Sequence, residues 1–463
     1  MQTPLIIITL TLVFGLCESQ AQFTFTRVVS TVTPVPGGTG PFDFMAYPCT
    51  DGQRVYFNGA DEAGHQGVFG GRGGALTTLA DWTTPIPGAS GVFEDFNRPR
   101  VSQGRVGFVG GNASVRGLYL VSTGAVERIA DTTVPLPGGG GLFQSCNSFS
   151  VGSWGVAFHA NYQLATEGIY RHSATGLAAV ATFQTPVPDG GGLTFGGFGF
   201  PMADEKGLTF FGNTGDTLRF GIYRAAESGA IQPVISNADI DPGSGTPYSA
   251  FGYQAVNSAR QLALVAASDE NRFMSLRFWT GDQWTTLAQL GTLLPGSSGA
   301  HISKFKPDVS LDEWGNVAFH ADDDTGNTGI YLATGGLLLK VMDLNTPVDE
   351  GKTPLDEHSL GLADNQMAGG MLTVYVVTGP GEFGIYVTPV PKPAPRMRLT
   401  AAAGTISLFW PTNATGFRLQ RTATLSPAGA WSDVTNAPTT LGTEFRVQLD
   451  LSGSAGFHRL VNP

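Results

Sequence analysis

The sequence is poor in charge and in basic residues. Charged residues make up 14% of the 463-residue chain and apolar residues 41%. This balance excludes an intrinsically disordered protein, which combines high charge with low hydrophobicity. Lys and Arg number 26 against 37 Asp and Glu, so the net charge is −11. An acidic chain repels the phosphates of nucleic acid, which is therefore not an expected partner.

Long hydrophobic runs and capped helical patterns are absent from most of the chain. No run of about 18 apolar residues occurs, so no membrane span is predicted. Leu5–Leu16 is a shorter, largely apolar stretch of 12 residues, followed by the small-x-small site Ser19-Gln20-Ala21. This pattern predicts a signal peptide over residues 1–21. We therefore expect a protein that is secreted or extracellular, with association to the cell surface left open.

Glycine and proline are abundant, with 64 and 29 residues, and they mark a repeat. Thr33-Pro34-Val35-Pro36-Gly37-Gly38 returns in weaker or stronger form six more times. With Pro36 as the marker, the corresponding positions are 36, 87, 137, 188, 242, 295 and 349. A fixed period of this size is typical of propellers and solenoids.

Each repeat carries the same internal order of short strands. After the Pro-Gly connector comes an aromatic segment, then a strand such as Gly155-Val156-Ala157-Phe158, and then Gly-Ile-Tyr or a relative of it. An apolar column precedes the connectors at Val28, Leu79, Ile129, Val180, Val234, Leu287 and Val341. About four strands in roughly 50 residues is the size of a propeller blade. We expect the connectors to run in extended polyproline geometry from one blade to the next.

The two ends of the repeat region predict how the ring closes. The seventh repeat stops after Gly384-Ile385-Tyr386, where Pro389–Pro395 replace a fourth strand. Phe25–Val32 supplies the missing strand from the other end of the chain. The sequence thus predicts an all-β fold, a seven-bladed β-propeller over residues 22–391 that the N-terminal strand closes. A string of independent β-modules is the alternative.

Residues 392–463 lack the repeat but contain about six alternating segments, among them Thr405–Trp410 and Phe445–Leu449. Such segments predict a small β-sandwich. Leu408-Phe409-Trp410-Pro411 and Phe457-His458-Arg459-Leu460 make this tail resemble the fibronectin-type-III-like modules of bacterial extracellular proteins. The repeats, in turn, resemble a family of secreted bacterial proteins of unknown function with TPVPGG-type units, expected to be β-propellers.

The two cysteines that follow the predicted signal peptide are Cys49 and Cys146. They fall in the first and third repeats, which are not neighbours in a ring. Two unpaired thiols are therefore the prediction, and one disulfide is the alternative.

The candidate site residues come from the innermost strand of each blade, where propeller ligands meet the central channel. We select Glu94, Asp95, Arg98 and His358 as binding residues. Adjacent carboxylates in a strand point to opposite faces, which disfavours a catalytic pair. The Asp322-Asp323-Asp324 run lacks the spacing of a calcium loop, and His159 and His320 fit structural roles better than ligation. No catalytic residue, metal or cofactor is predicted.

Taken together, these features predict a secreted, non-enzymatic protein that binds or displays extracellular polysaccharide, envelope material or another protein. The alternative is a hydrolase or lyase that acts on polysaccharide at the channel mouth. Convergent carboxylates there would favour the enzyme, and their absence would favour the binder. A purely structural scaffold is a third reading, and the oligomeric state is left open.

Overall fold

The computed structural model describes residues 23–461, apart from 138–140, 164–165, 189, 270–271, 364, 394, 396, 403–404, 413–415, 424–430, 443 and 451–455. The predicted signal peptide lies outside the described residues. The described part of the chain contains strands and no helix, which confirms the all-β prediction. It divides into two compact units, one formed by Gln22–Pro391 and the other beginning at Lys392.

The first unit consists of seven antiparallel sheets. The first sheet contains β2 (Phe42–Thr50), β3 (Val55–Asp61), β4 (Gln66–Gly71) and β5 (Thr77–Asp81), and the second contains β6 (Asp95–Ser102), β7 (Arg105–Gly111), β8 (Arg116–Ser122) and β9 (Ala125–Asp131). The third sheet contains β10 (Ser145–Gly152), β11 (Gly155–Gln163), β12 (Thr166–Ser173) and β13 (Gly176–Thr182). The fourth contains β14 (Phe195–Ala203), β15 (Gly207–Thr214), β16 (Phe220–Ala226) and β17 (Ile231–Ser236).

The other three sheets have the same order, and the first strand of the fifth and of the seventh is split into two short strands. The fifth sheet contains β18 (Ala250–Phe251) and β19 (Ala255–Val256) with β20 (Leu262–Ala267), β21 (Ser275–Trp279) and β22 (Trp284–Gln289). The sixth contains β23 (Ile302–Leu311), β24 (Val317–Asp323), β25 (Thr328–Thr334) and β26 (Leu337–Asp343). The seventh contains β27 (Leu360–Gly361) and β28 (Met367–Ala368) with β29 (Met371–Gly379), β30 (Glu382–Pro389) and β1 (Thr26–Ser30).

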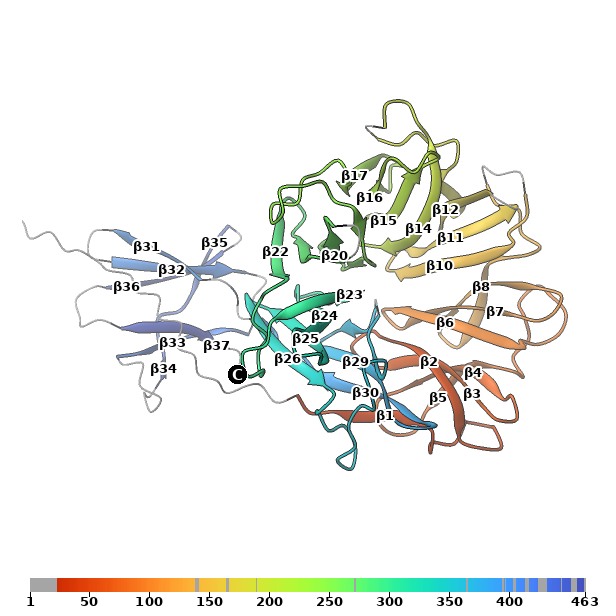
Figure 1. Cartoon of the computed structure of the whole chain (residues 1–463), viewed down its shortest axis with the longest axis horizontal. Coiled ribbons are helices and arrows are strands. Elements are labelled where there is room, and N and C mark those ends of the chain that lie inside the picture. Colours follow the sequence, from red (N-terminus) through yellow and green to blue (C-terminus); the bar gives the residue numbers. More distant parts are fainter. Residues whose placement is uncertain are drawn as a thin grey trace, which may run out of the picture. The chain divides into compact units, whose positions relative to one another are not determined.

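The seventh sheet joins the two ends of the unit. β1 pairs antiparallel with β30, so that Val29 lies opposite Ile385 and Ser30 opposite Gly384. The first strand of every sheet contacts the sheet before or after it, and β2 of the first sheet contacts β28 and β29 of the last. Figure 1 shows these first strands around a common centre.

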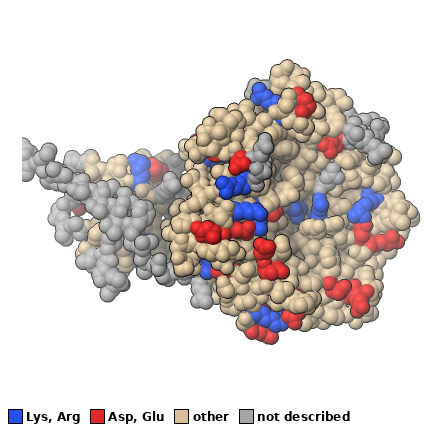
Figure 2. All heavy atoms as spheres, in the orientation of Figure 1, with Lys and Arg blue, Asp and Glu red and all other residues tan. Residues whose placement is uncertain are grey.

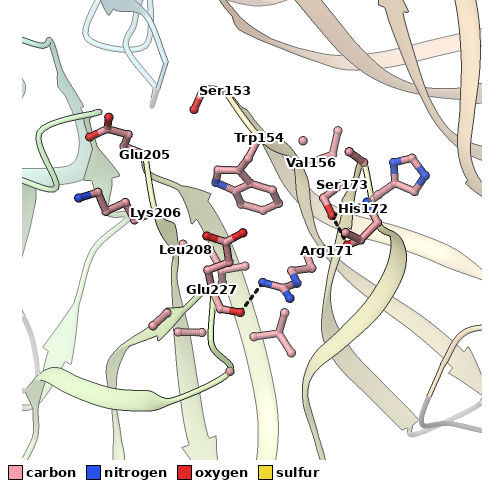
Figure 3. A pocket seen from close by; sticks show the side chains of 18 of the residues that line it. Ser153, Trp154, Val156, Arg171, His172, Ser173, Glu205, Lys206, Leu208 and Glu227 are labelled. Carbon is pink, nitrogen blue, oxygen red and sulfur yellow. Dashed lines mark hydrogen bonds between the residues drawn. The ribbon is translucent and has the colours of Figure 1, made fainter.

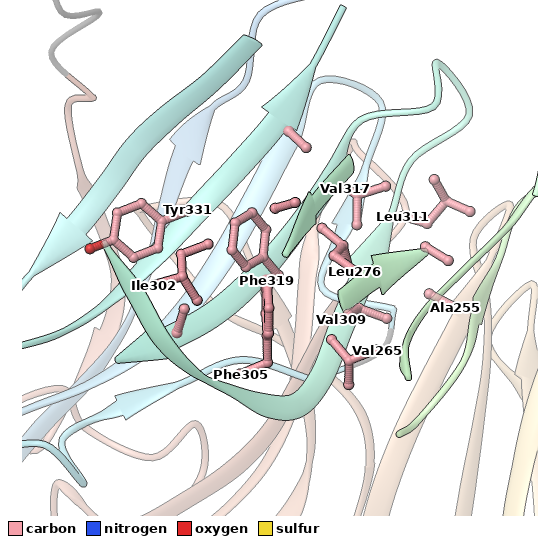
Figure 4. Close-up of a cluster of buried hydrophobic side chains, with 14 of the residues drawn as sticks. Ala255, Val265, Leu276, Ile302, Phe305, Val309, Leu311, Val317, Phe319 and Tyr331 are labelled. Atoms are coloured by element: carbon pink, nitrogen blue, oxygen red, sulfur yellow. The ribbon is translucent and has the colours of Figure 1, made fainter. Parts of the chain in front are cut away.

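The hydrophobic core lies between neighbouring sheets. One cluster joins Val265 and Leu276 of the fifth sheet to Phe305, Val309 and Phe319 of the sixth (Figure 4). Because each sheet is covered on both faces by its neighbours, its strands are apolar on both sides. This explains the nearly continuous apolar runs of the second and third strands.

The repeated Phe and Gly-Ile-Tyr motifs meet as cross-strand pairs. Phe158 of β11 lies opposite Tyr170 of β12, with ring centroids 5.5 Å apart, and both rings are fully buried. Phe108 and Tyr119 form the same pair in the second sheet at 5.8 Å. Such aromatic pairs add about 0.5–1.5 kcal/mol beyond the apolar area they bury.

The predicted extended geometry of the connectors is wrong. The chain folds back on itself, since the N–H of Val35 donates to the carbonyl of Gly40 and that of Phe42 to Thr33, both at 2.9 Å. This turn buries the residue between the two prolines. The connector threonine accepts a hydrogen bond from the N–H three residues before it, at 2.9–3.1 Å, in Thr33, Thr84, Thr185, Thr292 and Thr346. The connectors are therefore compact caps on the outer strands.

The predicted apolar column does belong to the core. Val28, Ile129 and Val341 are buried, and the others pack against the buried clusters. Cys49 and Cys146 are not joined by a disulfide. Burial raises the pKa of the Cys146 thiol to about 12, so it stays protonated at neutral pH.

The second unit contains two small sheets. One has the order β31 (Arg398–Ala402), β32 (Thr405–Pro411), β36 (Glu444–Asp450) and β35 (Thr439–Leu441), and the other β34 (Ser432–Asp433), β33 (Arg418–Thr422) and β37 (Phe457–Val461). Leu408 and Trp410 of the first sheet and Leu419 of the second form its core, together with Val447.

Candidate functional site

The first strand of every sheet is interrupted at the same place. In β2 the pairing with β3 slips between Ala46 and Cys49, and in β6 that with β7 slips between Asn97 and Arg100. The other first strands slip or break at 146–148, 199–202, 252–254, 305–309 and 362–366. A β-bulge turns side chains out of the pleat of the strand. Five bulges and two strand breaks therefore turn side chains out of the sheets at the same level.

Four of these interruptions hold a non-glycine residue in the left-handed region. The φ angles are 51° for Tyr47, 50° for Arg98, 47° for Phe200 and 62° for Asn365. A side chain in this region is disfavoured by its Cβ, and such residues cluster at functional sites.

Hydrogen bonds between sheets fix the bulges in place. The N–H of Phe200 donates to Ser148 Oγ at 3.2 Å, and the Gln254 amide donates to the Phe200 carbonyl at 2.7 Å. The N–H of Tyr253 donates to the carbonyl of Pro307 at 3.0 Å. The third, fourth, fifth and sixth sheets are thus tied to one another at this level.

The bulges enclose a cavity of about 210 Å³, here called the channel cavity. All seven sheets line it, and one lining residue from each in turn is Tyr47, Arg98, Ser148, Phe200, Tyr253, Asp308 and Ala363. Arg100, Phe149, Pro201, Met202 and Gln254 complete the lining.

The channel cavity combines aromatic rings with charge. Tyr47, Phe200 and Tyr253 are 41%, 42% and 38% exposed, although large apolar side chains are usually buried. The rings of Phe200 and Tyr253 meet edge to face with centroids 4.5 Å apart. Arg98 and Arg100 supply positive charge, and Asp308 is the only carboxylate among the described lining residues. Figure 2 shows Lys and Arg side chains near the middle of the unit, with acidic ones beside them and along its rim.

Of the four predicted binding residues, only Arg98 lines the channel cavity. Glu94 Oε2 accepts a hydrogen bond from the N–H of Ala113 at 3.3 Å, and Asp95 forms an ion pair with Arg116. His358 lies before β27 with its side chain 83% exposed, 3.6 Å from the Glu357 carboxylate. The structure therefore does not bring the four residues together.

The remaining polar candidates have structural partners. Asp322 is paired with Lys306 at 3.0 Å, and Asp323 Oδ1 accepts the N–H groups of Thr325 and Asn327. Within the described residues, no cluster of His, Cys, Asp or Glu has the arrangement of a metal site.

The two histidines of the second strands are held by side chains of their own sheets. His159 bonds Glu167 at 2.9 Å. Burial raises the pKa of Glu167, but the hydrogen bond and charge of His159 outweigh this and leave it below its usual range. His320 bonds Thr328 at 2.8 Å, and burial lowers the pKa of His320 to about 4.

The aromatic residues of the channel cavity were missed, although the sequence carries a signal for them. Four bulges contain a large side chain followed by proline, in Tyr47-Pro48, Arg98-Pro99, Phe200-Pro201 and Lys306-Pro307. Proline cannot donate to the ladder and is confined to edge strands and bulges. The recurrence of this dipeptide at the period of the connectors would have located the site.

The model of a family of unknown function, DUF7453, matches residues 49–217 and 155–345, which together span more than half of the chain. The protein belongs to this family. Among curated proteins, none matches the chain.

Several solved β-propellers are similar at low identity. The propeller domain of the Trilobed protease from Pyrococcus furiosus is 10% identical, with a TM-score of 0.45 over 74% of this chain and 92% of that one. Oligogalacturonate lyase in complex with manganese is 12% identical, with a TM-score of 0.45 over 81% and 98%. The six-bladed Aleuria aurantia lectin is 11% identical, with a TM-score of 0.33 over 69% and 96%. None of the described residues forms a helix that could cross a membrane.

Proposed function

We propose that the protein is a secreted, non-enzymatic binding protein that holds an extracellular glycan in the channel cavity of a closed, seven-bladed propeller. The pairing of β1 with β30 and the contacts of β2 with β28 and β29 support closure. A ring closed in this way leaves no long open sheet edge between its first and last blades.

The observation that carries the proposal is the convergence of three part-exposed aromatic rings and two arginines in one cavity. A sugar ring presents an apolar C–H face and a rim of hydroxyls. The faces of Tyr47, Phe200 and Tyr253 suit the former, and the Arg98 and Arg100 guanidiniums suit the latter. A guanidinium also binds carboxylate groups in a bidentate manner, which favours acidic glycans.

The described lining favours binding over glycoside hydrolysis. Glycoside hydrolysis by the usual route needs two carboxyl groups roughly 5–10 Å apart across the scissile bond. Asp308 is the single carboxylate among the described lining residues. The cavity is also smaller than the roughly 300–1,000 Å³ of typical small-molecule pockets, which suits one terminal sugar unit of a longer chain.

We assign residues 1–21 to a signal peptide and residues from 392 to a fibronectin-type-III-like sandwich. The two-sheet arrangement around Trp410 supports the second assignment. Pro391, Pro393 and Pro395 suit a semi-rigid spacer between the two units. A cell-surface or matrix glycan is the partner that this organisation fits.

The test is a glycan array and an acidic-polysaccharide pull-down with residues 22–463. We expect Tyr47→Ala, Phe200→Ala and Arg98→Ala each to weaken retention at least about tenfold, or roughly 1.4 kcal/mol. Phe44→Ala, an exposed aromatic of the same strand as Tyr47, and Arg72→Ala, an exposed arginine of a turn, are matched controls. Glu94→Gln and Asp95→Asn should also leave retention unchanged. Equal retention by the cavity variants and the wild type would refute the proposal.

A further inference from the structure

A larger pocket lies away from the channel cavity, and the two share no lining residue. It measures about 630 Å³, within the roughly 300–1,000 Å³ range of small-molecule sites. Three neighbouring sheets line it, those of β6–β9, β10–β13 and β14–β17, largely through the hairpin turns that end their strands. We name it the three-sheet pocket (Figure 3).

Trp154 presents a fixed aromatic surface in this pocket. It lies in the turn between β10 and β11, and its indole N–H donates to the carbonyl of Asp204 in the next sheet at 2.8 Å. The side chain also packs against the core between these two sheets. Because both contacts hold the indole, a ligand that covers its free surface does not have to order it.

Carboxylates without protein partners surround this surface. Those of Glu127, Glu205 and Glu227 line the pocket, and among the described residues none of the three accepts a hydrogen bond or forms an ion pair. Figure 3 shows Glu227 beside the Trp154 ring and Glu205 farther from it, next to Lys206. These groups offer several acceptors in a pocket large enough for a ligand.

The three-sheet pocket also contains hydrogen-bond donors. Arg171 donates to the backbone carbonyl of Glu227 at 3.0 Å, which leaves its other N–H groups for a ligand. Lys206 adds an ammonium group that has no ion-pair partner within the described chain. With Arg105, the pocket holds three basic groups and three acidic ones, so it has no net preference for a charged ligand.

We propose that the three-sheet pocket is a second saccharide site, specific for a neutral sugar unit. The apolar face of a pyranose would lie on Trp154, its hydroxyls would donate to Glu205 and Glu227, and its oxygens would accept from Arg171. This assignment goes beyond the glycan proposed for the channel cavity and does not depend on it. A carboxylated sugar gains no net attraction, because the three carboxylates of the lining balance its three basic groups.

The sixth sheet provides a matched control. Trp314 occupies the corresponding turn, between β23 and β24, but packs against the backbone of Gly370 in the seventh sheet, where an added Cβ would lie 2.8 Å from its ring. The seventh sheet has Gly369-Gly370 where the fourth has Glu205-Lys206. Trp314 therefore covers backbone, whereas Trp154 stands among charged side chains.

The experiment titrates residues 22–463 with methyl glycosides of glucose, galactose, mannose, xylose and N-acetylglucosamine. Binding is followed by saturation-transfer NMR and by tryptophan fluorescence. We expect at least one glycoside to bind with a dissociation constant on the order of 1 mM. Trp154→Ala and the pair Glu205→Gln with Glu227→Gln should each weaken it at least about tenfold. Trp154→Phe should retain part of the affinity.

The controls separate this site from the channel cavity. Trp314→Ala and Phe200→Ala should leave glycoside binding unchanged. Loss of binding in Phe200→Ala with retention in the Trp154 and glutamate variants would place the sugar in the channel cavity and overturn the inference. Absence of binding by all five glycosides would overturn it as well, while the acidic-glycan test of the channel cavity would stand. If Trp154→Ala does not fold, the double variant Glu205→Gln with Glu227→Gln tests whether the sugar binds in the three-sheet pocket.

Discussion

Tyr47, Arg98 and Phe200 hold backbone conformations that a Cβ disfavours, and all three line the channel cavity. Residues in this region cost on the order of 1 kcal/mol or more each, and they persist only where the surroundings enforce them. Here the enforcing contacts are the strand ladders on either side of the bulge. The strain is located where the proposed ligand binds.

Replacing Tyr47 by glycine and by alanine separates strain from side-chain contacts. Both variants lose the ring, but only glycine adopts φ 51° without penalty. We expect Tyr47→Gly to be more stable than Tyr47→Ala by roughly 1 kcal/mol, measured by chemical denaturation. In an ordinary strand the order is the reverse, so the same pair at Thr77, in β5, serves as the control. An alanine variant at least as stable as the glycine variant would contradict the assigned strain.

His320 makes stability depend on acid. Burial lowers the pKa of His320 to about 4 in the folded protein, whereas an unfolded histidine titrates near 6.5. The unfolded chain therefore binds the proton first, and stability falls as the pH drops from about 6.5 toward 4, by roughly 3 kcal/mol for this group. We expect His320→Gln to lose less stability than the wild type between pH 7 and pH 4.5. Parallel stability curves for the two proteins would rule out this role of His320.

At the scale of strands and connectors, the sequence predicted what local pattern determines. The segments around Phe158 and Tyr170 are short runs of apolar and aromatic residues between turn residues, a pattern that predicts buried strands, and both lie in strands. The connectors were predicted wrongly because their shape depends on hydrogen bonds that close over several residues, such as that from Val35 to Gly40. A proline-rich composition favours extended geometry but does not exclude a turn.

β1 is the strand that joins the two ends of the seven-sheet unit, and deleting it tests whether it stabilises that unit. Deleting residues 22–32 removes the partner of β30 and buried Val28 and Val29. The exposed edge and the lost core should lower the melting temperature sharply and promote aggregation. Val32→Ala, at a position 73% exposed just after β1, should change neither property. A truncated protein that melts like residues 22–463 would show that β1 does not stabilise the seven-sheet unit.

At the scale of the whole molecule, the chain divides at Pro391 into units with separate cores. A protein that ends at Pro391 should keep the melting transition of the seven-sheet unit, because its hydrophobic clusters contain no residue beyond that point. Calorimetry of the long and short forms measures this. Loss of that transition in the short form would mean that the tail contributes to the main fold.

The candidate site was only partly predictable because it depends on the arrangement of the whole molecule. Arg98 was selected because it lies in an innermost strand, as do Tyr47 and Phe200, which were not. Their convergence depends on the arrangement of the sheets, which brings together positions that are 51, 102 and 153 residues apart in sequence. The three-sheet pocket likewise forms between sheets and has no counterpart in any single repeat.

The interruptions of the first strands also affect which residues of the channel cavity could change as the family evolves. The position that faces the channel cavity recurs once per repeat, and its orientation follows from backbone pairing on either side rather than from the side chain it carries. Exchanges there leave the buried Phe and Tyr pairs untouched. The residues that line the channel cavity can therefore diverge among descendants one position at a time while the scaffold is inherited intact, and the same freedom makes the seven-sheet unit a suitable starting point for engineered binding surfaces.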